Sequence, residues 1–497
     1  MIYNTSLTPQ LQEIADSLAK KAEDVGLDCF TTVFEMVDYQ QLNEVAAYGG
    51  FPTRYPHWRW GMEYERLSKS YTYGLSVIYE MVINNDPCYA YLLRSNSLVF
   101  QKTVIAHVYG HCDFFKNNYW FSKTNRKMLD KMANHATIVR KLIEEVGHDE
   151  VENFIDVCLS IENLIDIHSP FHASSVPLSA EEKEQLSSKP ISKISSKTYM
   201  DKYVNPEDYL EKQQEKIREQ AKRSQKFPES PQLDVLKFLL EFAPLTTWQK
   251  RILNVIRDEA YYFAPQGQTK ILNEGWATYW HSKMMTSIAP LEASEIVDYC
   301  DHYAGVIANH SGQLNPYRLG VGLLNHIEKR WNRGQFGLDY LHCEDPRDRE
   351  NWNKETGLGK QKIFEVRKMH NDITFIDEFL DEDFCHETKM FLYDFDPRLG
   401  KYVISSRDFS GIKKQLLQQL TNFGNPRIEV EDGNFRNRGE LLLRHQHETV
   451  DLKHEFTLET LKNIHSIWKR PVHLETIVEN IKRRICFDGH NHSIEKI

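Results

Sequence analysis

The sequence predicts a mainly α-helical protein with a smaller α+β domain at its C-terminal end. Three observations support this fold class. Apolar residues recur at helical spacing over much of the first 369 residues. One polar stretch, rich in Ser, Lys, Glu and Gln, interrupts that pattern. After residue 370, short apolar or alternating segments separated by Asp-Gly turns are typical of strands.

The same changes of pattern divide the chain into four parts. Residues 1–173 form the N-terminal helical part of the main domain, and residues 233–369 form its second helical part. Between them, residues 174–232 are predicted to be an exposed polar insertion or linker, because aromatic residues are few there. Residues 370–497 form the α+β domain, which is long enough to fold independently.

The helices follow from capping residues and apolar spacing. Thr8 followed by Pro9 is a helix start, with proline at the first helical position. Further helices are predicted at residues 68–82, 90–120, 128–166 with a break at Gly147, 233–263, 270–285 and 319–331. The turn-forming sequence Pro265-Gln266-Gly267 is predicted to end the helix that precedes residue 270.

The C-terminal domain is predicted to alternate strands with two helices. The strands are Met390–Asp394, Tyr402–Ser406, Arg427–Glu431, Leu441–His445 and Val472–Ile477, and the helices are Phe409–Leu420 and Leu458–Trp468. Nothing in this part indicates catalysis. We expect it to bind a protein partner or to cover a site on the main domain.

Charge and cysteine content exclude several classes of protein. The net charge of −10 argues against nucleic acid or an anionic membrane surface as the main partner. The eight cysteines include no Cys-x-x-Cys pair, so reduced thiols are predicted. No apolar run approaches 18 residues and no signal peptide is recognisable, so we expect a cytoplasmic protein without a transmembrane segment.

Two histidines four residues apart lie on one predicted helix. His107 and His111 would share a helix face, about 6 Å apart, so both imidazoles can reach one metal ion. The other pair at this spacing, His168 and His172, spans a proline that would break the helix. Glu274, on another predicted helix, is the natural third ligand. Two histidines and one glutamate with an open position are the ligands of many catalytic zinc sites.

Asp113 offers a different arrangement of ligands. His111-Cys112-Asp113 is a His-x-Asp pattern, which non-haem iron enzymes combine with a distant histidine. That arrangement requires a strand, where residues two apart share a face, whereas the segment Lys102–Phe115 is predicted to be helical. We keep it as an alternative.

The two metal-binding segments together resemble those of the gluzincin metallopeptidases. There, His-Glu-x-x-His supplies two ligands and a later Asn-Glu-Gly-aromatic-Ala supplies the third, as in Asn273-Glu-Gly-Trp-Ala277. The resemblance implies a zincin-like helical main domain that holds one Zn²⁺ through His107, His111 and Glu274. Val108 departs from the pattern, because it replaces the glutamate that activates the metal-bound water. A base must therefore come from elsewhere, or hydrolysis is absent.

Several longer segments resemble the SpoVR family, the stage V sporulation protein R group of bacteria. They are Tyr48–Glu65, Ile83–Tyr91, the segments around His107 and Glu274, Asn315–Gly320 and Asn371–Phe379. The family is associated with formation of the spore cortex, although it also occurs in bacteria that do not sporulate. The resemblance implies a cell-wall peptide as the first substrate class to test, but it assigns no reaction.

Three polar residues are candidates for the chemistry that Val108 does not supply. Glu259 and Tyr262, one helix before Glu274, are predicted as the base and an oxyanion donor. His281 lies seven residues after Glu274 on the same helix face. It can be a further ligand, a proton shuttle or a core histidine, and we favour a role in the site.

Substrate binding is predicted in a loop of turn-forming residues. His310, Asn315, Tyr317 and Arg318 carry the donors that hold a peptide carboxylate or carbonyl, and Arg318 is the first choice for a carboxylate. A structural salt bridge is an equally good reading of Arg318.

The sequence therefore predicts a zinc-dependent amide-bond enzyme. It would hydrolyse or rearrange a peptide, as a peptidase, an amidase or a transpeptidase-like enzyme, with peptidoglycan of the spore-cortex type as the first candidate substrate. The alternative is a non-catalytic, zincin-like scaffold or regulatory protein in a bacterial sporulation or stress pathway, because a zincin that has lost hydrolysis would lack the glutamate that Val108 replaces.

Overall fold

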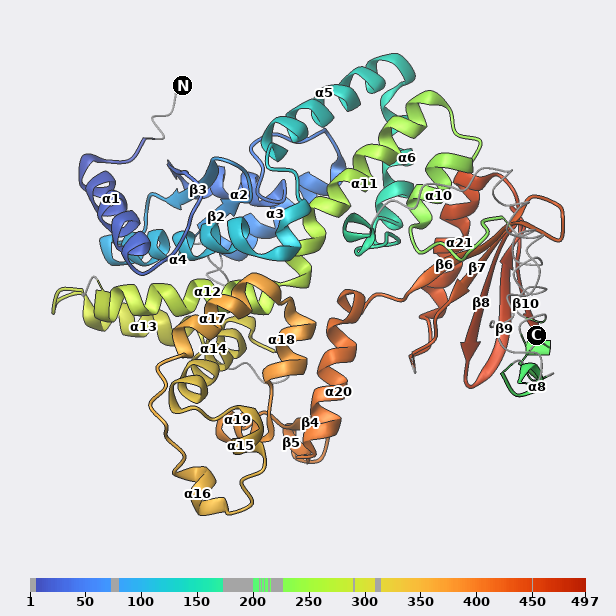
Figure 1. The fold of residues 1–497 in the computed structure, drawn as a ribbon. Coiled ribbons are helices and arrows are strands. Elements are labelled where there is room, and N and C mark those ends of the chain that lie inside the picture. Colours follow the sequence, from blue (N-terminus) through green and yellow to red (C-terminus); the bar gives the residue numbers. More distant parts are fainter. Residues whose placement is uncertain are drawn as a thin grey trace. The chain divides into compact units, whose positions relative to one another are not determined.

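The structure is a computed structural model, and its described residues form a mainly helical protein with a separate C-terminal sheet domain, as predicted (Figure 1). The chain forms two compact units, each built from two segments. The first combines Met1–Val151 with Tyr261–Gly424, and the second combines Glu152–Ala260 with Asn425–Ile497. The described residues are 6–72, 80–172, 200–204, 206, 208–209, 211–212, 215, 227–288, 291–308, 314–448 and 450–497.

These boundaries differ in position from the divisions that the sequence suggested after residues 173, 232 and 369. Most of the predicted insertion, residues 174–232, lies outside the described residues. Among the described helices, none combines the length and the apolar character needed to cross a membrane.

Helices make up most of the first unit. Before the unit boundary they are α1 (Pro9–Asp24), α2 (Tyr39–Ala47), α3 (Trp58–Thr72), α4 (Leu98–Asn117), the 3₁₀ turn η1 (Tyr119–Lys123) and α5 (Met128–Val146). After it they are α12 (Lys270–Lys283), the π-helical turn η3 (Met284–Ile288), α13 (Ile296–Val306), α14 (Pro316–Arg333), α15 (Gly337–Leu341), α16 (Pro346–Glu350), α17 (Gly359–Met369), α18 (Asp372–Phe379), α19 (Glu382–Thr388), α20 (Phe409–Leu420) and η4 (Thr421–Gly424).

The first unit also contains a small sheet where the sequence predicted helix. Strands β1 (Thr32–Val37), β3 (Cys88–Leu93) and β2 (Glu80–Ile83) lie in that order, β1 parallel and β2 antiparallel to β3. The helical prediction for parts of 68–82 and 90–120 is therefore wrong. Most of the central strand is buried, and a short apolar run of this kind has no periodicity to distinguish it from a helix.

Glycines bring three helices of the first unit into close contact. A Cβ at Gly110 of α4 would lie 2.6 Å from the Cα of Ala277 on α12. A Cβ at Gly275 of α12 would lie 2.5 Å from the Cα of Gly320 on α14. Real Cβ atoms do not approach backbone atoms so closely, so only glycine permits this spacing. The close packing brings side chains of α4 and α12 within reach of one another.

The helix that precedes α12 continues through its proline. Helix α11 spans Thr247–Gln268 with Pro265 inside it, so the prediction that Pro265-Gln266-Gly267 ends the helix is wrong. The break lies at Thr269 instead, whose hydroxyl donates to the carbonyl of Pro265 at 2.7 Å. Pro265 has no N–H to donate to the carbonyl four residues before it, and the helix continues for only three residues beyond it.

The second unit has a five-stranded sheet with the order β10-β9-β8-β7-β6. Its elements are α6 (His148–Ser160, which begins in the first unit), η2 (Ser169–Phe171), α8 (Asp201–Val204), α10 (Val235–Phe242), most of α11, β6 (Ile428–Phe435), β7 (Glu440–His445), α21 (His454–Trp468), β8 (Val472–Val478), β9 (Ile481–Phe487) and β10 (His492–Lys496). Strands β7 and β8 are parallel, and the other neighbours are antiparallel.

Three of these strands, β6 to β8, were predicted from the sequence, and two were missed. Strand β9 carries three consecutive basic residues and β10 is exposed along its whole length, so neither has a clear apolar pattern. The predicted strands near residues 390 and 402 form a separate hairpin in the first unit, β4 (Leu392–Asp396) and β5 (Lys401–Ser406).

Candidate metal centre

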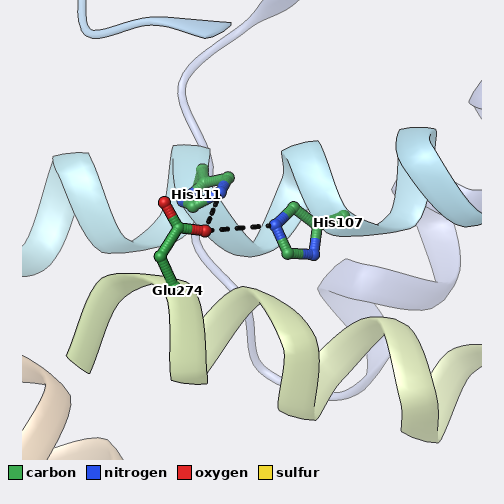
Figure 2. A group of neighbouring side chains, drawn as sticks. All are labelled: His107, His111 and Glu274. Carbon is green, nitrogen blue, oxygen red and sulfur yellow. Dashed lines mark ion pairs between the residues drawn. The ribbon is translucent and has the colours of Figure 1, made fainter. Parts of the chain in front are cut away.

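Two histidines of α4 and one glutamate of α12 meet at the contact between these helices (Figure 2). His107 and His111 are 4 % and 5 % exposed, and the side chain of Glu274 is 20 % exposed. One ligand atom from each residue lies within 4.8 Å of the other two. Among the described residues, this is the one group of His, Cys, Asp or Glu side chains that comes together in this way.

The separations within this group fit a shared metal ion. Glu274 Oε2 lies 3.4 Å from Nε2 of His111 and 3.6 Å from Nε2 of His107. Charge-assisted hydrogen bonds are shorter, at about 2.7–2.9 Å. Ligands at about 2.0–2.1 Å from a tetrahedral zinc ion are roughly 3.3 Å apart. The two distances from Glu274 are therefore close to those expected of ligands around one ion.

The electrostatics of Glu274 also suit a metal ligand. Burial alone would raise its pKa, but His111 and His107 outweigh that effect and hold the pKa of Glu274 well below its usual value. Its Oε2 atom is buried and makes no hydrogen bond with the described residues. An ionised and buried carboxylate needs positive charge beside it, which protonated imidazoles supply, or which a cation would supply when both imidazoles are neutral.

Each histidine ring is oriented by a second side chain of α12. Oδ1 of Asn273 lies 2.9 Å from Nδ1 of His111, and Nδ1 of His281 lies 2.9 Å from Nδ1 of His107. A histidine that donates its Nδ1 proton to such a partner presents the lone pair of Nε2 as a ligand. Burial, with His107 and His302 nearby, lowers the pKa of His281 well below its usual value, so His281 is neutral and its Nδ1 can accept a hydrogen bond from His107.

Buried carboxylates hold α12 in this position. Asp113 of α4 accepts a hydrogen bond from the Trp276 indole at 2.8 Å and another from the backbone N–H of Asp28 at 2.8 Å. Asp372 of α18 accepts from the N–H groups of Ile271 and Leu272 at 2.8 and 2.9 Å, which caps the start of α12.

These hydrogen bonds of Asp113 argue against the alternative in which His111 and Asp113 bind iron together. Asp113 lies on a helix, and its two carboxylate oxygens are already engaged, one with the Trp276 indole of α12 and the other with the N–H of Asp28. Residues two apart on a helix do not share a face, so Asp113 cannot join His111 at one metal ion.

The comparisons with known proteins confirm the resemblance to the SpoVR family. The chain matches the family described as SpoVR like protein over residues 6–425. The chain belongs to the SpoVR family. A SpoVR-like C-terminal domain matches over residues 426–479. The chain is also 29 % identical over 486 residues to a protein of Escherichia coli (strain K12) named uncharacterized protein YcgB. The aligned region covers 90 % of this chain and 88 % of the relative. No solved structure matches.

Among the described residues, the His/His/Glu group of this SpoVR-family chain contains no second carboxylate. Val108, which follows His107, is fully buried in the hydrophobic core. Within the described part of the chain, Glu274 is the one acidic residue of the group. Glu259 is buried in the part of α11 that belongs to the second unit, and its role as a base stays a prediction.

The other predicted catalytic residue of α11 has a backbone partner. The hydroxyl of Tyr262 donates to the carbonyl of Asn84 at 3.0 Å, and its ring packs on Phe51 in a core cluster. His281, by contrast, contacts His107 directly. Of the three catalytic candidates, the structure therefore brings His281 to the His/His/Glu group, where it contacts the ring of His107.

The predicted substrate residues do not form one site, although Asn315 and Arg318 line the same pocket. The ring of Tyr317 lies 6.2 Å from that of His107, between centroids. Arg318 lines a pocket with residues of α19, β4, β5 and α20. The side chain of Asn315 caps α14 by accepting from the N–H of Arg318 at 3.2 Å, and its amide donates to the carbonyls of Val306 and Ala308. His310 lies outside the described residues.

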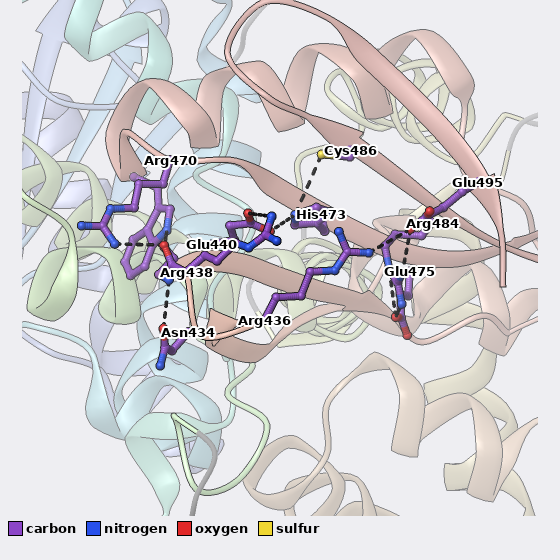
Figure 3. A network of polar contacts seen from close by, with 12 residues as sticks. Asn434, Arg436, Arg438, Glu440, Arg470, His473, Glu475, Arg484, Cys486 and Glu495 are labelled. Atoms are coloured by element: carbon purple, nitrogen blue, oxygen red, sulfur yellow. Dashed lines mark hydrogen bonds and ion pairs between the residues drawn. The ribbon is translucent and has the colours of Figure 1, made fainter.

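A histidine, a cysteine and a glutamate also meet in the second unit, but not as a catalytic triad (Figure 3). Glu440 lies 2.9 Å and the Cys486 sulfur 3.9 Å from His473, and both contact the same nitrogen, Nε2. In a nucleophilic triad the nucleophile and the orienting acid contact different nitrogens of the histidine. This cluster is therefore part of the polar network of the sheet.

Sequence reasoning missed the residues that support the ligands. Asn273 is part of the Glu274 motif and Gly110 lies inside the histidine motif, so both were visible but had no assigned role. Asp372 lies in a segment recognised only through the family resemblance. Their partners are far away in the sequence, and no local pattern reveals them.

Proposed function

We propose that this SpoVR-family protein holds one Zn²⁺ through His107, His111 and Glu274 and is a metal-dependent amide-bond enzyme with a zincin-like main domain. The observation that carries the proposal is the meeting of three ligand atoms from two helices within 4.8 Å. Two imidazoles and a carboxylate form a donor set that suits zinc. When bound, zinc in such a site polarises a carbonyl and lowers the pKa of a bound water toward about 7.

The protein's own residues would orient and charge this site. Glu274 supplies the negative charge, while Asn273 and His281 fix the two imidazole rings. Tyr317, from a third helix, adds an aromatic side chain beside His107. The open coordination position would accept a peptide carbonyl, and the sporulation link in the family name makes a cell-wall peptide the first substrate to test.

Metal content tests the site itself. We expect about one zinc per chain in the wild type and its loss in His107→Ala and Glu274→Ala, because each variant removes one of three protein ligands. His386→Ala and Glu365→Ala are matched controls, since both side chains are exposed on other helices of the same unit. Equal metal in all five proteins, or none after reconstitution with zinc, would overturn the site.

A second function is favoured by Val108. Its apolar side chain is buried where gluzincins carry the glutamate that activates water. The alternative is a regulatory scaffold in which zinc only stabilises the fold. A panel of peptides and muropeptides separates the two functions: cleavage or transfer by the wild type, lost in Glu274→Ala, supports the enzyme. Stoichiometric zinc with every substrate unchanged supports the scaffold.

A further inference from the structure

The N-terminal end of α14 directs consecutive side chains to two different places. The ring of Tyr317 approaches His107, whereas Arg318 lines a pocket of about 630 Å³ in the first unit. Gly320, which packs on α12, follows Arg318 by two residues, or roughly 200° around the helix. Arg318 therefore lies on the side of α14 opposite to α12, and the pocket is distinct from the metal centre.

The pocket has the size and lining of a small-molecule site. Its walls come from α14, the end of α19, the β4–β5 hairpin and α20. Much of the lining is aromatic or aliphatic, with Leu314, Phe384, Phe391, Tyr402 and Ile412 among the residues. Natural ligand sites typically enclose about 300–1,000 Å³ behind mostly apolar walls with a few polar groups that fix orientation.

Two cations provide such polar groups. Arg318 and Lys389 both line the pocket, and within the described part of the chain neither side chain makes an ion pair. Asp394 is the one carboxylate of the lining, so the charged lining is net positive.

The backbone of Lys389 is fixed in place. It adopts a left-handed conformation with φ 55° at the end of α19, and its carbonyl accepts from the Tyr393 hydroxyl at 3.0 Å. The ammonium group therefore extends from a defined point beside the pocket.

We propose that this pocket binds a ligand with an apolar body and one carboxylate, which Arg318 and Lys389 hold. A guanidinium pairs with a carboxylate through two parallel hydrogen bonds, and the aromatic walls shelter the apolar part. Such a ligand can be a fatty-acyl carboxylate or the C-terminal end of an apolar peptide. The inference does not depend on the metal centre, because no pocket residue is a proposed ligand.

Calorimetric titration of the full chain with octanoate and with N-acetyl-trileucine, each beside its neutral amide, tests the proposal. We expect at least one free acid to bind, and we expect its amide to bind at least about tenfold more weakly than the acid. The acid that binds identifies the source of the ligand. Failure of both acids to bind at about 1 mM, or equal binding of acid and amide, would overturn the proposal.

Variants locate the binding in the pocket. Arg318→Gln and Lys389→Gln should each weaken the acid about tenfold, and Leu314→Ser should weaken acid and amide alike. Arg398→Gln removes the same charge from the same hairpin outside the lining and should bind as the wild type does. All these side chains are exposed, so folding is not at risk. Unchanged binding in both Arg318→Gln and Lys389→Gln would overturn the assignment, whatever their zinc content.

Discussion

Asn273 and His111 meet across the contact between α12 and α4, with Oδ1 and Nδ1 2.9 Å apart. Asn273 immediately precedes Glu274, so one short segment of α12 supplies both the carboxylate of the His/His/Glu group and the side chain that orients a histidine of the other helix. An amide oxygen can only accept, so this pairing assigns the proton to Nδ1 of His111 and the lone pair to Nε2. The lone pair then lies on the side of Glu274.

Asn273→Ala should therefore weaken zinc without removing a ligand. Loss of a group that orients a ligand typically costs about 10- to 100-fold in metal affinity. Asn273→Asp keeps an acceptor oxygen and should retain most of the affinity. Competition with a chromophoric chelator measures the zinc dissociation constant, with Asn353→Ala, an exposed asparagine, as the control. An unchanged constant in Asn273→Ala would show that the hydrogen bond does not hold the ring.

The glycine contacts between helices predict a second effect on the same site. In Gly275→Ala the new Cβ would meet the backbone of Gly320, so α12 and α14 must separate. Overpacking of this kind costs about 1–3 kcal/mol of stability, and the shift of Glu274 should also weaken the binding of zinc.

Gly305→Ala is the matched control, because a Cβ at that helical glycine meets nothing within 4 Å. It should be neutral or stabilising by up to about 1 kcal/mol. Equal stability of the two variants in urea unfolding would contradict the close contact.

Parts of this arrangement could be predicted from the sequence, because they depend on local spacing. His107 and His111 lie four residues apart on a helix, and Glu274 lies in a recognisable motif, so their meeting followed from helix geometry and from the family resemblance. The mainly helical class followed from apolar periodicity in the same way.

What the sequence did not reveal depends on contacts between distant segments. The pairing of β1 with β3 involves residues more than fifty positions apart, and the buried run Cys88–Leu93 has no alternation that would distinguish it from a helix. The side chains of Tyr317 and Arg318 reach different places because of how α14 is rotated about its axis against α12. The glycine contacts between the two helices fix that rotation. Neighbours in the sequence can therefore belong to different sites.

Chelation should destabilise the wild type and leave Glu274→Ala unaffected. A ligand that binds only the folded state stabilises it by about 2.7 kcal/mol at one hundred times its dissociation constant. Removal of zinc with a chelator should therefore lower the melting temperature of the wild type by a few degrees. The variant has lost a ligand, so its melting temperature should not respond. The same response in both proteins would mean that any bound metal lies elsewhere.

Acid should weaken the second unit through His445. This buried side chain of β7 pairs with the hydroxyl of Thr476 at 2.9 Å. Burial, and then the neighbouring His447, lower the pKa of His445 to about 4, against an opposing effect of Asp451. An unfolded histidine has a pKa of about 6.5, so the unfolded chain binds a proton first as the pH falls. The free energy of unfolding should therefore be unaffected by His445 above pH 6.5 and should fall by roughly 3 kcal/mol between pH 6.5 and 4.

Urea unfolding over this range should show a smaller decrease in His445→Gln than in the wild type, with the exposed His454→Gln as control. If His445→Gln and the wild type lose stability in parallel, then His445 is not the group that acid protonates.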